Sequence, residues 1–130
     1  MSRFAEIKPL FKYNRVAYYS VAINGSTTTL YKEFVQLQEK KNKKKLYHIL
    51  KWIQVIGKKY GARQNFFRNE AHGADASALP PKGKDREPCY VEKGKTTTNT
   101  LRLYCLRANE NVVFLFSGDI KTTRYPQDCP

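Results

Sequence analysis

The chain has few of the residues that build metal centres and disulfide frameworks. Its three cysteines, Cys89, Cys105 and Cys129, are an odd number, so at least one has no disulfide partner within the chain. No Cys-x-x-Cys or Cys-x-x-His spacing occurs, and the sequence therefore predicts no metal site and no other cofactor. Cys105 lies within an apolar strand pattern and is expected to be a small core residue.

Long apolar runs are also missing. Nothing approaches the roughly 20 consecutive apolar residues that a membrane span requires. Residues 1–8 contain no apolar run of the kind found in a signal peptide. The sequence has neither a GxGxxG motif nor a P-loop, and it shows no internal repeat. It therefore predicts a cytoplasmic protein that does not associate with a membrane.

Acidic residues are scarce. Only 11 Asp and Glu stand against 24 Lys and Arg, which gives a net charge of +13 and an isoelectric point near 9.8. This balance favours a polyanion as partner, with RNA the first to consider. A ribosome-like scaffold, a protein with an acidic partner, and a lysine-rich surface with no nucleic-acid role stay open. The hydrophobic content of 41% and aromatic content of 13% are typical of a folded protein.

The 130 residues are enough for one domain with a real core, which we place at residues 13–130. Residues 1–12 are mixed in composition and contain Pro9, so they predict an extension or a short irregular arm. Residues 13–23 are rich in β-formers and stop at Asn24-Gly25, so they predict a strand. Ser26, Thr27 and Thr28 then offer caps for a first helix. A second apolar stripe, from Leu46 to Ile56, predicts another helix that ends in the region 57–61.

The last part of the chain predicts a loop followed by strands. Residues 65–87 are polar, with several Gly and Pro, and predict a long loop. Residues 89–91 predict a short strand, and residues 100–107 and 112–116 predict a hairpin. The expected fold is therefore α+β, in the order β-α-α-β-β-β. It would have an antiparallel sheet of about four strands, with the last three in a meander and an antiparallel helical hairpin on one face.

Lysines between the predicted helices, and aromatics on or beside the apolar stripe, could bind RNA. Lys43 and Lys44 belong to the run 40–45, which interrupts the apolar stripe where the two helices would join. A solvated helix corner with like charges is the stronger explanation of this run. Three aromatic side chains on or beside the stripe are expected to be core residues rather than base-stacking platforms: Tyr47, Trp52 and Tyr60.

Cationic side chains also mark the predicted C-terminal hairpin. Arg102 occupies a strand position where packing alone would favour an apolar residue. Lys121, Arg124 and Tyr125 lie in the polar segment after the second strand. Cations and a phenol near the end of a sheet are suited to holding a phosphate.

The element order, together with residues 101–106 (LRLYCL) and 112–121 (VVFLFSGDIK), resembles the RelE/ParE toxin superfamily, and most closely its phage-derived HigB-like branch. The similarity covers residues 13–125. It implies the toxin of a type II toxin–antitoxin system, paired with a cognate antitoxin protein. Most RelE-like and HigB-like members cut mRNA on the ribosome, without a metal. ParE-like members inhibit DNA gyrase instead, so the fold does not determine the activity.

The resemblance implies roles for individual residues. Cleavage by the ribose 2′-OH needs a base, an acid and positive charge on the developing phosphorane. Arg102 matches the family's strand arginine and would stabilise that charge, while Lys121 and Arg124 match its basic turn. Tyr125 stands where several members have a tyrosine, and His72 could act as acid or base. Lys93 and Lys95 match lysines that precede the arginine strand and would bind substrate.

Each of these residues also has a purely structural explanation. Arg102 could pair with Glu70 or Asp119 within the sheet. Lys121 and Arg124 could be ordinary surface charges, and Tyr125 could pack on the sheet. A nucleic-acid-binding module without catalysis, which rests on charge and aromatic content alone, therefore stays open beside the nuclease and the gyrase inhibitor.

Overall fold

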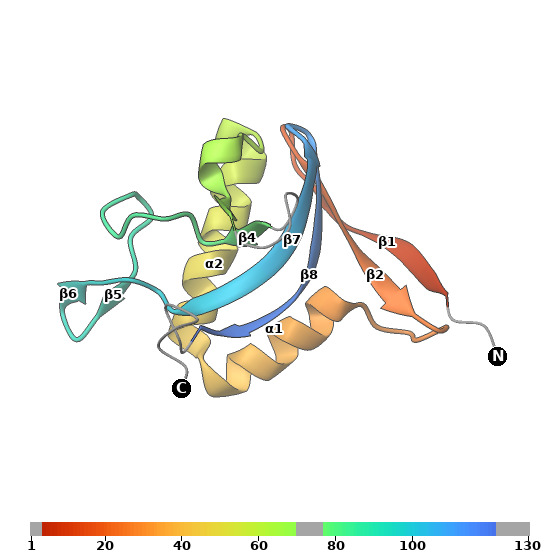
Figure 1. Cartoon of the computed structure of the whole chain (residues 1–130), viewed down its shortest axis with the longest axis horizontal. Coiled ribbons are helices and arrows are strands. Elements are labelled where there is room, and N and C mark those ends of the chain that lie inside the picture. The colour runs from red at the N-terminus through yellow and green to blue at the C-terminus, as the bar shows by residue number, and fades with distance from the viewer. Residues whose placement is uncertain (1–3, 70–76, 122–130) are drawn as a thin grey trace, which may run out of the picture.

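A computed structural model describes residues 4–69 and 77–121 of the chain (Figure 1). The two helices and the long C-terminal hairpin are joined by shorter strands and turns. In chain order the elements are β1 Ala5–Lys12, β2 Ala17–Ile23, α1 Leu30–Lys41, α2 Lys43–Val55, a π-helical turn Ile56–Tyr60, a 3-10 turn Gln64–Phe66, β3 Arg68–Asn69, β4 Ser77–Leu79, β5 Val91–Glu92, β6 Lys95–Thr96, β7 Leu101–Asn109 and β8 Val112–Ile120.

The main sheet has six strands in the order β1-β2-β8-β7-β4-β3. β2 pairs with β8 in parallel, whereas all other neighbours in this sheet are antiparallel. The α+β class is confirmed, but the predicted antiparallel sheet of about four strands is wrong. The sheet is mixed because the N-terminal and C-terminal hairpins meet through one parallel pair of central strands.

The N-terminal arm predicted at residues 1–12 is also wrong, because residues 5–12 form β1. This strand pairs with β2 along its length and forms one edge of the main sheet. The register shifts between Pro9 and Phe11. Proline is tolerated at an edge strand or a bulge, where its missing N–H removes no ladder bond. The proline that suggested irregular chain therefore marks a bulge within a strand.

The helix break at the lysine run is confirmed. Thr29, one residue after the predicted caps, accepts a hydrogen bond from the Lys32 backbone N–H and so caps α1. Asn42 separates the two helices, and its backbone N–H donates to the Gln38 carbonyl. The helices meet at an open corner rather than lying side by side, so the predicted antiparallel arrangement is wrong (Figure 1). We call residues 40–45 the lysine corner.

The core lies between the helices and one face of the main sheet. Alternate residues of β7 and β8 are buried on this face, including Leu101, Leu103 and Leu115. Leu46 and Ile49 of α2 belong to the same apolar cluster, as do Tyr31 and Phe34 of α1. The predicted helical cover on one face of a sheet is therefore correct in outline.

Helix α2 ends at Val55, just before the predicted region 57–61, although the chain stays helical beyond it. It continues as the π-helical turn and stops at Gly61, whose φ of 79° is a conformation that favours glycine. Gly57 lies under the Tyr13 ring, so closely that a β-carbon at position 57 would overlap the ring. The first glycine thus permits close packing, and the second ends the helix.

The predicted meander of the last three strands is wrong. β5 and β6 form a separate two-stranded hairpin, and Figure 1 shows it projecting from the body of the molecule. Lys93 and Gly94, at the tip of this hairpin, both have positive φ, as in a tight type I′ turn. β4, within the segment predicted as a loop, takes the place beside β7.

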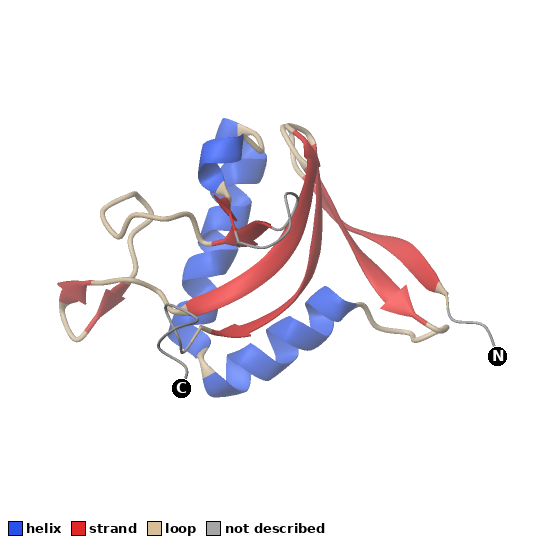
Figure 2. Ribbon diagram, in the orientation of Figure 1, coloured by secondary structure: helices blue, strands red, loops and turns tan. Residues whose placement is uncertain are grey.

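The connection between β4 and β7 is mostly loop (Figure 2).

The C-terminal hairpin itself is confirmed. β8 extends to Ile120, so residues 117–120, predicted as part of a polar turn, continue the strand. Lys121 follows immediately.

Candidate nucleic-acid interface

Two adjoining hollows on the surface bring the lysine corner and the β5–β6 hairpin together. Their free volumes are about 580 Å³ and 420 Å³, which is within the range of small-molecule sites. They share Lys45, Glu92 and Lys93, and we call them together the lysine groove. The groove is lined by Lys40, Lys41, Asn42, Lys43, Lys44, Lys45, Tyr90, Glu92, Lys93, Lys95, Thr97, Thr98 and Thr100.

Local structure explains why the lysines converge. The lysine run falls at the break between α1 and α2 and forms one side of the groove. The tight turn at Lys93 places this residue and Lys95 on a projecting hairpin opposite the corner. Apart from Lys45, which is half-buried, these lysines are exposed. Like charges this close repel one another, and a bound polyanion relieves the repulsion.

One carboxylate lies within this cationic groove. Glu92 accepts a hydrogen bond from the Tyr90 hydroxyl, and this bond, together with nearby Lys45 and Lys93, holds the pKa of Glu92 below its usual value. Burial and the same hydrogen bond raise the pKa of Tyr90 to about 12. At neutral pH the pair is therefore a carboxylate and a neutral phenol, and the Glu92 charge partly offsets the lysines.

The structure brings four of the predicted cations into this groove. Lys43 and Lys44 come from the corner, and Lys93 and Lys95 come from the β5–β6 hairpin. Tyr47, expected in the core, is instead 41% exposed and lies with its ring 5.7 Å from the Lys43 Nζ. Trp52 is buried, as expected. An aromatic side chain is thus exposed beside the lysine corner.

Arg102 lies at the start of β7, next to the groove but almost covered. It is 7% exposed, and its Nη1 donates to the carbonyl oxygens of Asn99 at 2.6 Å and Leu101 at 3.2 Å. The sheet register puts Asp119 directly opposite. In this arrangement part of the guanidinium holds the backbone that leads into β7, and a phosphate contact by Arg102 stays a prediction.

Lys121 is tied to the same segment. Its backbone N–H donates to the Thr100 carbonyl at 2.8 Å, and Thr100 lines the groove. Lys121 is exposed, and its backbone is bonded directly to a residue of the groove wall. His72, Arg124 and Tyr125 lie outside the described residues, and their proposed roles stay predictions.

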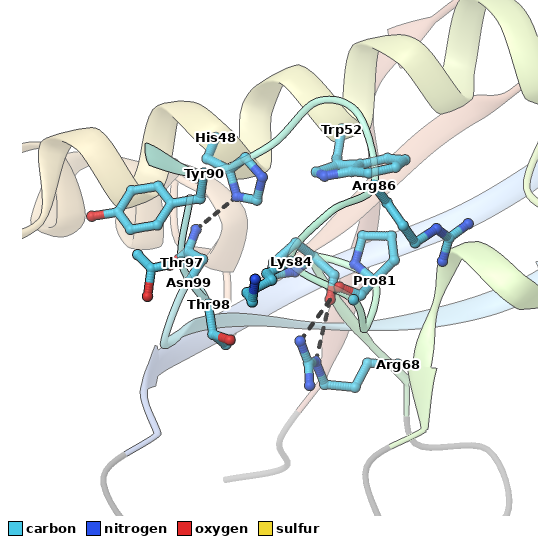
Figure 3. Close-up of a pocket in the computed structure, with 12 residues that line it drawn as sticks. His48, Trp52, Arg68, Pro81, Lys84, Arg86, Tyr90, Thr97, Thr98 and Asn99 are labelled. Atoms are coloured by element: carbon cyan, nitrogen blue, oxygen red, sulfur yellow. Dashed lines mark hydrogen bonds between the residues drawn. The ribbon is translucent and has the colours of Figure 1, made fainter. Parts of the chain in front are cut away.

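His48 and Asn99, the pair that organises this region, were not predicted from the sequence (Figure 3). The Asn99 amide nitrogen lies 2.9 Å from His48 Nδ1 and donates to the Lys45 carbonyl at 2.9 Å. His48 Nε2 lies 2.8 Å from the Pro88 carbonyl oxygen. Burial lowers the pKa of His48, as does Lys51, against the opposing effect of the Pro88 bond. A histidine within an apolar helical stripe and an asparagine in a threonine-rich run gave no spacing signal.

A much smaller cavity lies behind this pair. Its volume of about 20 Å³ has room for roughly one water molecule, not for a nucleotide. Arg68 lines the cavity and donates to the carbonyls of Pro80 and Pro81 (Figure 3). Arg86 lies over the rings of Trp52 and Phe66. These two arginines hold loop backbone and aromatic rings, whereas the groove lysines face solvent.

Within residues 4–69 and 77–121, no group of three or more His, Cys, Asp and Glu side chains is placed to hold a metal ion. Nor does this part of the chain contain a helix long and apolar enough to cross a membrane.

Comparison with known proteins adds nothing to the geometry: no family model, curated protein or solved structure matches the chain.

Proposed function

We propose that the protein binds RNA along the lysine groove and acts as the toxin of a type II toxin–antitoxin system. The observation that carries this proposal is the meeting of the lysine corner with Lys93 and Lys95 across one groove. Opposed rows of cations suit a chain of phosphates, and an exposed tyrosine beside them suits an unpaired base. Single-stranded RNA offers both features at once.

The proposed activity is ribosome-dependent cleavage of mRNA in the cytoplasm, without a metal ion. The ribose 2′-OH would attack the adjacent phosphate, break the bond to the 5′ oxygen and leave a 2′,3′-cyclic phosphate. Arg102 and Lys121 would supply positive charge to the phosphorane, while His72, Arg124 and Tyr125 are the candidates for proton transfer and further charge. A separately encoded antitoxin would neutralise the protein.

A second candidate is RNA binding without cleavage, and one observation favours it. Arg102 is almost covered, and its Nη1 donates to two backbone carbonyls. Under this alternative the groove binds RNA without cutting it, and the protein affects the cell only by occupying the RNA.

Expression in cells separates these candidates. Wild-type protein, Lys121→Ala and a variant with Lys93 and Lys95 both changed to alanine are induced, and mRNA 5′ ends are mapped during translation. Growth arrest with new 5′ ends in the wild type, reduced in both variants, is the expected result. A variant with Lys12 and Lys32 changed to alanine has the same charge as the double groove variant and serves as its control, because these exposed lysines do not line the groove.

The other outcomes are equally informative. RNA binding with intact messages would support the non-catalytic candidate. Growth arrest with intact messages and inhibited DNA supercoiling would overturn the RNA proposal in favour of gyrase inhibition. Absence of RNA binding by the purified wild type would reject both RNA candidates.

A further inference from the structure

The two walls of the lysine groove belong to elements far apart in the sequence. We propose that His48 and Asn99 are positioning residues that hold these walls together, and that protonation of His48 loosens the groove and weakens its grip on RNA. The proposal rests on RNA binding by the groove.

The orientation of the Asn99 side chain is fixed by two backbone partners. Its Oδ1 accepts from the Leu101 N–H at 2.9 Å, and its Nδ2 donates to the Lys45 carbonyl at 2.9 Å. A flipped amide would set its nitrogen against an N–H and its oxygen against a carbonyl. Asn99 is 3% exposed, so water cannot easily replace these partners.

This orientation assigns the state of His48. Because Asn99 Nδ2 is a donor, His48 Nδ1, 2.9 Å away, must accept and carries no proton. The proton of the neutral ring is then on Nε2, which donates to the Pro88 carbonyl at 2.8 Å. A second proton on Nδ1 would face the Asn99 amide hydrogens, and Asn99 cannot turn to accept it without losing both backbone bonds.

These bonds join the parts of the chain that carry the groove. Lys45 is in the lysine corner, and Pro88 comes shortly before the β5–β6 hairpin. Asn99 lies between groove-lining residues Thr98 and Thr100, and its carbonyl accepts from Arg102 Nη1. One imidazole and one amide therefore link the corner, the hairpin and the start of β7.

The surroundings of His48 favour the neutral ring. Burial lowers the pKa of His48, against the opposing effect of the Pro88 bond, and Lys51 on the same helix lowers it further. The cavity that His48 lines is cationic, with Arg68, Lys84 and Arg86 contributed by other segments. The Tyr90 ring lies 5.6 Å away, but its hydroxyl is committed to Glu92, the nearest groove carboxylate. No described carboxylate lines this cavity to stabilise a second proton on His48.

The test measures affinity for a single-stranded RNA oligonucleotide at about pH 7.5 and about pH 5.5, at one ionic strength. The chain has two histidines, so all variants carry His72→Gln, which leaves His48 the only histidine. Charge alone predicts tighter binding in acid, because the protein becomes more positive. We expect the opposite: roughly three- to tenfold weaker binding at the lower pH, the scale of one lost buried hydrogen bond.

His48→Gln in the same background should abolish this acid weakening. Asn99→Asp keeps the acceptor for Leu101 and places a carboxylate beside Nδ1. This carboxylate raises the pKa of His48 and accepts the second proton, so the variant should lose the acid weakening. Circular dichroism and thermal melting confirm that each variant is folded. Binding that tightens or stays constant in acid, or acid weakening that persists in His48→Gln, overturns the proposal.

A readout without RNA keeps the two proposals separate. Nitrogen-15 NMR of His48 should show a neutral ring protonated on Nε2 at neutral pH, and an Nδ1-protonated ring would contradict the positioning role. If this signature is present but RNA does not bind at either pH, the proposed function fails while the assigned hydrogen bonds stand. If RNA binds independently of His48, only the positioning proposal fails.

Discussion

Gly118 of β8 packs against the backbone of Arg102 on β7, so closely that a β-carbon at position 118 would overlap the Arg102 carbonyl oxygen. The register of the two strands shifts between Leu103 and Cys105, and Gly118 pairs with Leu103 beside this irregularity. A glycine is therefore needed where the two longest strands approach each other, at the level of the arginine that holds Asn99.

Gly118→Ala should destabilise the protein by about 1–3 kcal/mol, because the backbone must move to admit a methyl group. Chemical denaturation monitored by Trp52 fluorescence measures this loss. Ser117→Ala, at the exposed preceding position, is the control and should have little effect. Equal stability of Gly118→Ala and wild type would show that β7 and β8 are not this close.

The salt dependence of RNA binding should decrease when groove lysines are removed. Each phosphate contact on a single strand contributes about 0.7 to the slope of log affinity against log salt. Changing both Lys93 and Lys95 to alanine should therefore reduce the slope by up to about 1.4. The double variant at Lys12 and Lys32 should keep nearly the wild-type slope, and an equal reduction there would indicate binding by net charge alone.

Glu92→Gln should strengthen RNA binding, in contrast to the lysine variants. The substitution removes a negative charge from the groove, while the amide oxygen can still accept from the Tyr90 hydroxyl. We expect affinity to rise about two- to fivefold at low salt and the difference to shrink at high salt. Unchanged or weaker binding would place the RNA outside the groove. Glu33→Gln, on the exposed face of α1, is the matched control.

Protein stability should fall as the pH drops below about 6.5, the ordinary pKa of histidine. The pKa of His48 is lowered in the folded protein, so the unfolded chain takes up a proton first. The neutral His48 ring therefore contributes its full stability above the pKa that histidine has in the unfolded chain. This contribution is lost as the pH falls through the lower pKa of His48 in the folded protein. Denaturation between about pH 7.5 and pH 5 in the His72→Gln background measures this loss. His48→Gln should flatten the curve, and a curve of unchanged slope would contradict the buried neutral imidazole.

The sequence predicted the features that depend on local chemistry. The C-terminal hairpin follows from two strand-forming runs around a polar turn, and the helix break follows from charge that interrupts an apolar stripe. Gly61 ends the π-helical turn that follows α2, because a positive φ is easy only for glycine. These features need no information from distant parts of the chain.

The errors concern long-range pairing. Pro9 suggested an irregular arm because proline disfavours a central strand. The local sequence does not reveal that this segment forms an edge strand, where proline is tolerated. Nothing within β2 or β8 indicates that they pair in parallel. The groove was missed for the same reason: the lysine corner and Lys93 were both recognised, but their meeting depends on how the loop before β5 returns to α2. His48 and Asn99 come within hydrogen-bond distance only because the chain returns to α2.

The parallel pairing of β2 with β8 has a consequence for how the molecule is made. Ala17 pairs with Val112, so the sheet cannot form its centre until the ribosome has released almost the whole described chain. Until then α1 can pack only against β2 and α2, and the part of its apolar face that covers β8 stays exposed. Such distant contacts make folding slow. The face of α1 that covers β8 therefore finds its partner only after the other described elements of the chain have been made.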